Sequence, residues 1–299
     1  MADDVLLVIG ASGLVGPCLM RTLQQEGKTV VGTYASQRRE NLRSLDIRDI
    51  GQVHDCVAEL RPKTIYLAAA LTHVDYCEDH PEEAAQRNVE GPKNVAREAA
   101  TTGAKLVFYS TEYVFDGTQG PYDENAKTSP LSVYGRTKLE AEQAIREICS
   151  DYLIVRTTVV YGWDRNSVNF AMQIFKRVQS GDDMTIPDDQ IGNPTLAEYL
   201  AETTVSLVHR GAMGVVNVVG KDLMPRVDFA RALVCHYGGD LGKVIPVSTA
   251  SLKQKAARPL RGGLRTEKLE NLLGTPAISL EESLRRLKRQ QQEDSTINT

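Results

Sequence analysis

Short apolar runs alternate with longer segments of mixed polarity along the first half of the chain. Runs in which nearly every position is apolar are typical of parallel strands that helices cover on both faces. Strands are predicted at residues 5–9, 28–34, 64–70, 105–110 and 152–156, and helices at residues 14–26, 50–60, 82–101 and 134–149. This alternation predicts an α/β fold with a doubly wound parallel (Rossmann) sheet and right-handed crossovers.

The second half of the chain has a less regular pattern. Helices are predicted at residues 168–179 and 225–237, a strand at 215–219 and a basic loop at 258–265. A last helix begins at a capping box of Ser279 and Glu282, with Leu280, Leu284 and Leu287 on one face, and the polar residues 290–299 are expected to fray. We predict a nucleotide-binding domain from residues 1–161 and 191–220, and a smaller C-terminal substrate-binding lobe from residues 162–190 and 221–299.

Composition is that of an ordinary globular protein, with 41% hydrophobic and 25% charged residues. The net charge of −4 argues against a nucleic-acid partner. No apolar run reaches the ~20 residues that span a bilayer, and the N-terminus lacks the features of a signal peptide. The five cysteines are scattered and lack the spacing of metal ligands. We therefore predict a cytoplasmic protein with no membrane partner and no metal site.

Three glycines separate the first predicted strand from the first predicted helix. Gly10 permits a tight turn, Gly13 lets the backbone approach a pyrophosphate, and Gly16 allows close packing of helix and strand. The helix N-terminus offers free N–H groups to the anion. Strand, glycine turn and helix together predict a dinucleotide site that includes Ser12, Leu14 and Val15; the alternative is a tight turn that binds nothing.

Tyr134 and Lys138 are four residues apart on a predicted helix and therefore share one face. A nearby ammonium favours the phenolate and is expected to lower the pKa of the tyrosine, which makes it a useful proton donor and acceptor. Alone, the pair could equally be solvated on a surface helix.

Several candidate residues fall at the carboxyl ends of predicted strands. They are Gly10, Ala68 to Ala70, Thr111 and Thr157 with Thr158. In parallel sheets these ends meet at one edge, where ligands bind. The end of the second strand is followed by Ser36, Arg38 and Arg39 rather than by an acidic residue. Arginine binds phosphate in bidentate fashion, so this loop favours the 2′-phosphate of NADP(H), with NAD(H) possible; the alternative is an exposed basic loop.

Longer segments resemble a known family. Residues 110–117 (STEYVFDG) are similar to the motif STDYVFDG, residues 70–78 (ALTHVDYCE) to AAxTxVDxxE, and residues 189–195 (DQIGNPT) to DQxGxPT. Arg258 and Pro259 match an RP element near the C-terminus. With the glycine turn and the Tyr134–Lys138 pair, the chain resembles the extended short-chain dehydrogenase/reductase superfamily, and within it the dTDP-4-dehydrorhamnose reductases.

The resemblance implies roles at the matching positions. Tyr134 would donate a proton, Lys138 would hold the nicotinamide ribose, and Thr111 would bond the substrate oxygen, although a strand-end cap is the alternative for Thr111. Further cofactor contacts are implied at Asp46, Ile47, Ala68, Ala69 and Ala70. Substrate contacts are implied at Thr72, Val74, Asp75, Glu78, Thr111, Tyr113, Val159 and Arg258.

Some of these positions have a structural alternative. Tyr113 could be a core aromatic, Asp75 and Glu78 solvated loop charges, Asp46 a helix cap, and Arg258 part of a solvated basic loop with Arg261 and Arg265.

Two departures affect the substrate side. Val159 stands where the related reductases carry a tryptophan against the sugar, and Arg261 and Gly262 replace Asn and Ser. Losing a large ring opens space, so the substrate is expected to differ in shape.

The resulting hypothesis is the NADPH-dependent reduction of the 4-keto group of a nucleotide-linked 6-deoxysugar. The superfamily resemblance implies a homodimer. One alternative is an NAD-dependent nucleotide-sugar epimerase or dehydratase; the single acid at Glu112 argues against a dehydratase, which usually carries two. The other alternative is a regulatory subunit without catalytic activity, because the methionine adenosyltransferase beta subunit is similar to these reductases. The acidic loop at residues 70–78 favours an enzyme.

Overall fold

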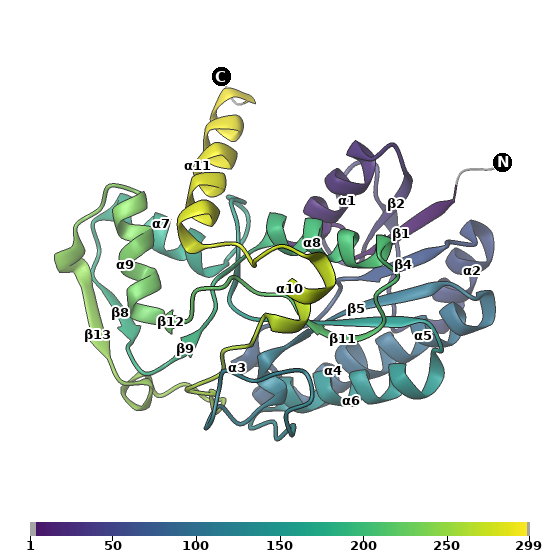
Figure 1. Cartoon of the computed structure of the whole chain (residues 1–299), viewed down its shortest axis with the longest axis horizontal. Helices are drawn as coiled ribbons and strands as arrows, with labels where there is room; N and C mark the ends of the chain where they lie inside the picture. Colours follow the sequence, from purple (N-terminus) through teal and green to yellow (C-terminus); the bar gives the residue numbers. More distant parts are fainter. Residues whose placement is uncertain (1–3, 298–299) are drawn as a thin grey trace.

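A parallel sheet forms the centre of the computed structural model, which describes residues 4–297 (Figure 1). Within this range seven strands follow the order β11-β6-β5-β4-β1-β2-β3, and each neighbouring pair is parallel. They are β1 (Val5–Ile9), β2 (Thr29–Tyr34), β3 (Arg43–Ser44), β4 (Thr64–Leu67), β5 (Lys105–Thr111), β6 (Tyr152–Thr157) and β11 (Gly214–Asn217). The order reverses between β1 and β4, where open α/β sheets bind ligands. The predicted doubly wound fold is confirmed.

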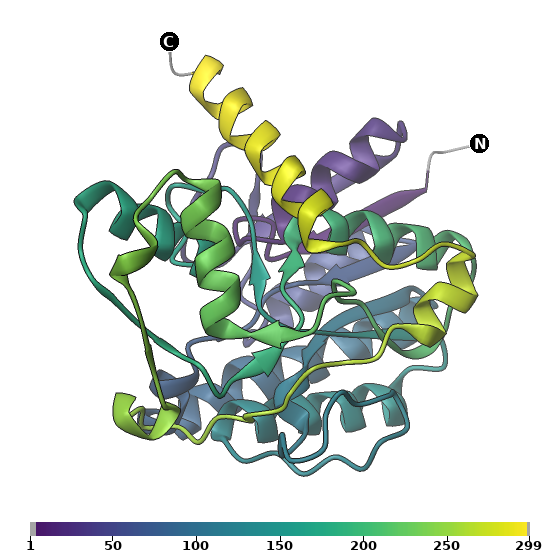
Figure 2. The ribbon, with the colours of Figure 1, turned by 60° about the vertical axis from the view of Figure 1, so that its left-hand side comes forward.

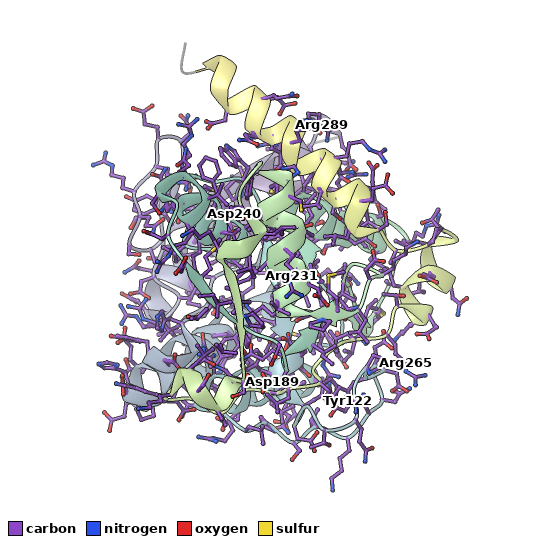
Figure 3. All side chains as sticks on the ribbon, turned by 90° about the vertical axis from the view of Figure 1, so that its left-hand side faces the viewer. Tyr122, Asp189, Arg231, Asp240, Arg265 and Arg289 are labelled. Carbon is purple, nitrogen blue, oxygen red and sulfur yellow. The ribbon has the colours of Figure 1, made fainter. Side chains whose placement is uncertain are left out.

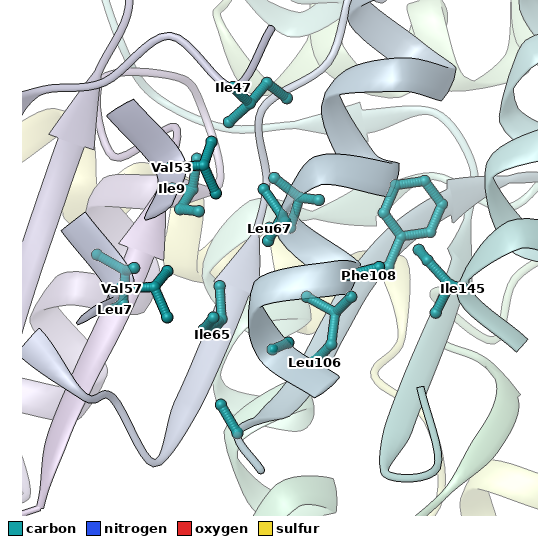
Figure 4. Packing of buried hydrophobic residues seen from close by; sticks show 14 of the residues in the cluster. Leu7, Ile9, Ile47, Val53, Val57, Ile65, Leu67, Leu106, Phe108 and Ile145 are labelled. Atoms are coloured by element: carbon teal, nitrogen blue, oxygen red, sulfur yellow. The ribbon is translucent and has the colours of Figure 1, made fainter. Parts of the chain in front are cut away.

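Helices cover both faces of the sheet. One layer contains α2 (Ile50–Leu60), α5 (Gly91–Thr102) and α6 (Val133–Ile148), and the other contains α1 (Gly16–Gln25), α8 (Ala197–His209) and α10 (Glu267–Leu273). Side chains alternate along β1, so that Leu7 and Ile9 pack under the first layer, while Leu6 and Val8 pack under the second. Figure 4 shows Leu7 beside Val57 of α2 in the first of these cores.

A smaller lobe lies beyond the carboxyl edge of the sheet (Figure 1). It contains α7 (Phe170–Ser180), α9 (Arg226–His236), and the parallel pair β8 (Met184–Pro187) and β13 (Val244–Val247). Its core gathers Tyr161, Ile174, Phe229 and, from α11 (Leu280–Ile297), Leu287. The lobe is therefore built from segments on both sides of β11 in the sequence.

Short ladders and polar side chains join the lobe to the sheet. The ladders pair β7 (Val160–Tyr161) with β10 (Thr195–Leu196), and β9 (Ile191–Gly192) with β12 (Met224–Pro225). Between them, the Asn193 amide donates to Gly220 O at 3.0 Å and accepts from Leu264 N at 2.8 Å. The remaining elements are α3 (Val74–Asp79), α4 (Pro81–Ala85), η1 (Gln86–Glu90), η2 (Glu112–Val114), η3 (Leu241–Lys243) and η4 (Thr249–Leu252).

Three elements differ from the prediction. The strand expected at 64–70 ends at Leu67, and a short helix, α3, follows at Val74. The helix expected at 82–101 is divided into α4, the π-helical turn η1 and α5. The prediction that the helix frays from residue 290 is wrong, because α11 continues to Ile297. Residues 298–299 lie outside the described range.

Tertiary contacts explain the length of α11, which lies beside α8 (Figure 2). Gln290 accepts a hydrogen bond from Trp163 N at 3.3 Å, and Asp294 accepts from Trp163 Nε1 at 3.0 Å. Arg289 donates to Glu198 of α8 at 2.8 Å. Polar residues with partners on other elements can therefore extend a helix that its own sequence would let fray.

The domain boundaries stay a prediction. Leu269 of α10, which falls in the predicted lobe, packs with Leu6 and Val8 of the sheet core. Among the described residues, no helix has both the length and the apolar content needed to cross a membrane.

Candidate active site

The glycine turn lies between β1 and α1, at the carboxyl edge of the sheet. Gly10 has φ +88°, and a Cβ there would lie 2.6 Å from Ala69 N; a Cβ at Gly16 would lie 2.4 Å from Gly10 O. A Cβ at Gly13 would meet only Gly10 O, at 3.5 Å, so the space in front of Gly13 is open. No side chain caps α1 at its N-cap, Val15. Open space and free N–H groups at a helix N-terminus fit the pyrophosphate of a dinucleotide.

Tyr134 and Lys138 lie on the buried face of α6. Ser132 caps this helix by accepting from Gly135 N at 3.1 Å, and a Cβ at Gly135 would lie 2.2 Å from Tyr113 O. This close approach presses α6 against the segment that follows β5. Tyr134 is 9% exposed and Lys138 is 2% exposed. A solvated surface helix is therefore the wrong interpretation of this pair.

The pKa of Tyr134 departs from the expected direction. Burial raises it above the ordinary value of a tyrosine, and the Glu112 carboxylate raises it further. Lys138 does not reverse this shift, because burial lowers its own pKa to about 7 against the opposing effect of Glu142. Its Nζ lies 3.9 Å from the centroid of the Phe108 ring. The net pKa of Tyr134 is therefore raised in the protein alone, in the direction opposite to the lowering that we expected from Lys138.

Thr111 lies beside Tyr134 and also acts as the cap that the alternative interpretation named. Its hydroxyl accepts from Tyr113 N at 3.2 Å at the start of η2, donates to Glu112 Oε2 at 3.3 Å, and interacts with the phenol of Tyr134. Glu112 is 7% exposed, and burial raises its pKa to about 7. A hydroxyl, a phenol and a carboxyl group thus meet at one strand end.

The acidic loop and the C-terminal arginine come together at the same edge. Arg258 Nη2 lies 2.8 Å from Asp75 Oδ1, and its Nη1 lies 3.5 Å from the Tyr113 hydroxyl. Glu78 accepts from Val133 N, just before Tyr134, at 2.7 Å. Asp75, Glu78 and Arg258 are therefore not solvated loop charges.

The remaining residues predicted to contact the substrate are Thr72, Val74, Tyr113 and Val159. Val74 packs in a cluster with Tyr134, whereas Thr72 is exposed. Tyr113 makes an edge contact with Tyr134, with ring centroids 5.6 Å apart. Val159 lies at φ +44°, in the left-handed region, and lines a cavity with Tyr113.

The residues predicted to hold the adenosine end of the cofactor lie in the segments that follow β2 and β3. Asp46 does not cap α2; Asp49 does, accepting from Gly51 N and Gln52 N. The hydrogen bond from Arg48 instead lowers the pKa of Asp46. Ile47 is 7% exposed, and its carbonyl accepts from Asn94 at 3.0 Å.

The basic loop that follows β2 is open to solvent. Ser36 and Arg38 are exposed, and Arg39 Nη2 lies 3.6 Å from Asp164 Oδ2.

Two features of the site were missed. Arg156, 1% exposed, makes a bidentate pair with Glu142 (2.9 and 2.7 Å), which ties β6 to α6. Arg226 of α9 lines the cavity beside Glu112 and Val159. Their sequence neighbours give no signal for these contacts, because the partners come from distant elements. Among residues 4–297, no group of His, Cys, Asp or Glu side chains is arranged to hold a metal ion.

Comparison with known proteins gives the family. The model of the RmlD substrate binding domain matches residues 4–292. The chain belongs to the RmlD substrate-binding domain family. The resemblance to dTDP-4-dehydrorhamnose reductases is thereby confirmed.

The relatives of this chain include both reductases and a subunit of a methionine adenosyltransferase. The dTDP-4-dehydrorhamnose reductase of Salmonella typhimurium is 35% identical over 277 residues, covering 89% of this chain and 90% of the relative. The methionine adenosyltransferase 2 subunit beta of Bos taurus is 32% identical over 290 residues, covering 93% of this chain and 86% of the relative.

A solved structure has the same fold as this chain. The dTDP-4-dehydrorhamnose reductase of Bacillus anthracis, in complex with NADP, superposes with a TM-score of 0.89 at 31% identity. The match covers 96% of this chain and 99% of that protein.

Proposed function

We propose that this chain is an NADPH-dependent reductase of the 4-keto group of a nucleotide-linked 6-deoxysugar. The observation that carries the proposal is the buried group of Thr111 and Tyr134, which interact with each other, beside Lys138 at the sheet edge that holds the glycine turn. Carbonyl reduction needs a proton donor and a polarising donor at this edge, and these side chains supply both.

The raised pKa of Tyr134 suits the reductive direction. A phenol whose pKa lies above its ordinary value remains protonated at neutral pH, so it is ready to donate to the carbonyl oxygen. The Thr111 hydroxyl would hydrogen-bond the same oxygen and would then stabilise the phenolate. Lys138 would hold the ribose of the nicotinamide and add positive charge beside the phenolate.

NADPH would supply the hydride when bound. The glycine turn and the N-terminus of α1 would hold its pyrophosphate, with Ser12 and Leu14 in the same turn. Ser36, Arg38 and Arg39 would hold its 2′-phosphate. The dTDP-4-dehydrorhamnose reductase of Bacillus anthracis was solved with NADP, which supports this choice of cofactor.

The proposal is tested by NADPH consumption with purified protein and a panel of 4-keto-6-deoxy nucleotide sugars. Consumption should require the sugar, and Tyr134→Phe should lower turnover by about 10²–10⁴-fold while cofactor binding, measured by fluorescence, is retained. An active Tyr134→Phe variant would remove Tyr134 from the mechanism.

A regulatory subunit is the second candidate, because the methionine adenosyltransferase 2 subunit beta aligns along most of its length. No consumption with any sugar, combined with tight binding to an adenosyltransferase catalytic subunit, would favour it. The homodimer and the cytoplasmic location stay predictions.

A further inference from the structure

In the proposed reaction Tyr134 gives up a proton each time a carbonyl group is reduced, and that proton must be replaced. The phenolate that remains is buried, because Tyr134 is 9% exposed. Burial raises the pKa of this phenol, so its charged form is unfavourable. Any side chain that returns the proton must reach the phenol through hydrogen bonds.

Thr111 connects the phenol of Tyr134 to the carboxyl group of Glu112. Its hydroxyl interacts with the phenol and donates to Glu112 Oε2 at 3.3 Å. Its oxygen also accepts from Tyr113 N at 3.2 Å. A hydroxyl has one proton to donate and two lone pairs that accept. When Glu112 is protonated, the same hydroxyl can therefore accept from the carboxyl group and donate to a phenolate.

Glu112 is suited to supply the proton. It is 7% exposed, and burial raises its pKa to about 7, so a substantial fraction of it is protonated at neutral pH. Because the pKa of the buried phenol is higher, transfer of a proton from Glu112 to the Tyr134 phenolate is favourable. Arg226 of α9 lies on the other side of Glu112 and favours the carboxylate that remains after the transfer.

A small cavity joins Glu112 to the lobe. Its volume is about 20 Å³, and its wall includes Glu112, Arg226 and Gln190. This volume has room for about one water molecule. The lobe holds Gln190 in place, because its Nε2 donates to Thr249 Oγ1 at 3.0 Å. The preceding residue, Asp189, accepts from Thr249 N at 3.0 Å (Figure 3). A water molecule in this cavity can pass a proton to Glu112 in a space too small for the substrate.

We propose that Glu112 returns a proton to Tyr134 through the Thr111 hydroxyl after each reduction. The O–H bond of the carboxyl group breaks as a new one forms on Thr111, and the original Thr111 O–H bond breaks as the phenol regains its proton. Glu112 is left as a carboxylate and takes its next proton from water in the cavity, so each turnover consumes one proton from solvent. This inference rests on the proposed function for the reaction that removes the proton from Tyr134.

The test compares the first turnover of the protein with the later ones. Protein loaded with NADPH is mixed rapidly with the 4-keto-6-deoxy nucleotide sugar that the panel identifies, and oxidation of NADPH is followed by its absorbance. Glu112→Gln keeps the size of the side chain but has no acidic proton. Its first turnover should keep the rate of the original protein, because Tyr134 carries its own proton, whereas its steady-state kcat should fall by about 10²-fold.

Two further variants separate proton supply from an effect on structure. Glu112→Asp keeps an acidic proton and introduces the residue type that the motif STDYVFDG has at this position, so it should recover most of the steady-state kcat. Glu147→Gln is the matched control, because Glu147 is exposed on α6 and its replacement should change neither rate.

Equal steady-state rates in Glu112→Gln and the original protein would overturn the inference and leave the reductase intact. A first turnover that is slowed as much as the later ones would also overturn it, because Glu112 would then only shape the site. No oxidation of NADPH by the original protein with any sugar would reject the reductase and this inference together.

Discussion

At the scale of single residues, burial rather than pairing sets the chemistry of the site. Tyr134, Lys138 and Glu112 are all buried, and each pKa moves toward the value that favours the neutral form. The spacing of Tyr134 and Lys138 places them on one face, but it cannot show how much water reaches them. The sequence therefore identifies the residues and gives the wrong direction for the phenol.

Glu112 should make the stability of the protein depend on pH. In the unfolded chain this carboxyl group ionises near its ordinary value of about 4.3, whereas burial raises its pKa in the folded protein to about 7. The folded state therefore holds a proton that the unfolded state loses, and the free energy of unfolding falls as pH rises between these values. The slope is at most about 1.4 kcal/mol per pH unit.

Urea unfolding at pH 5 and pH 8 would measure this effect. Glu112→Gln has no proton to lose, so it should lose less stability between the two values than the original protein does. The exposed Glu147→Gln on α6 should behave like the original protein. An identical pH dependence in the Glu112→Gln variant would show that Glu112 is ionised in the folded state throughout this range.

At the scale of elements, a buried ion pair fixes the helix that carries Tyr134 and Lys138. The Arg156 side chain of β6 is 2% exposed, and the Glu142 side chain of α6 is fully buried. Arg146 reaches the same carboxylate at 3.0 Å from the surface side, where it is 38% exposed. The two arginines thus approach one carboxylate from different environments.

Arg156→Leu should lower the free energy of unfolding by about 3–5 kcal/mol, because it removes the buried partner of Glu142. Arg146→Leu should cost less than about 1 kcal/mol, since a partly exposed ion pair contributes little. Denaturant unfolding of both variants measures the difference. Equal losses would mean that burial does not distinguish the two pairs.

Helix α11 holds the loop that follows β7. Trp163 is the single tryptophan, and its ring makes an edge contact with Phe175 at 4.9 Å between centroids. Asp294 accepts from Trp163 Nε1 at 3.0 Å and from Arg165 Nε at 2.6 Å. The end of the chain therefore fixes a loop beside the glycine turn.

Asp294→Ala should loosen this loop and let water reach the indole. The tryptophan emission of the folded protein should shift to longer wavelength, while the neighbouring Glu293→Ala leaves it unchanged. An unshifted spectrum in Asp294→Ala would show that the Trp163 ring is held without Asp294.

At the scale of the whole molecule, the sheet could be predicted from the sequence, but the contacts that join the lobe to the sheet could not. Buried parallel strands such as β1 leave continuous apolar runs, which a single sequence displays directly. Two-residue ladders such as β9 with β12 show no periodicity, and the Asp75–Arg258 pair joins distant segments. Arg226 was missed for the same reason, because only the fold brings it to the cavity beside Glu112.

The place of β11 in the chain has a consequence for biosynthesis. β11 closes one edge of the sheet against β6, yet β7, α7, β8 and α8 lie between them in the sequence. While the chain leaves the ribosome, the N–H and C=O groups on the outer edge of β6 remain unpaired until β11 has been synthesised. Such an edge is a template for pairing with other chains. We expect nascent chains that stop before residue 214 to aggregate or to need a chaperone, although they already contain the glycine turn, Thr111, Tyr134 and Lys138.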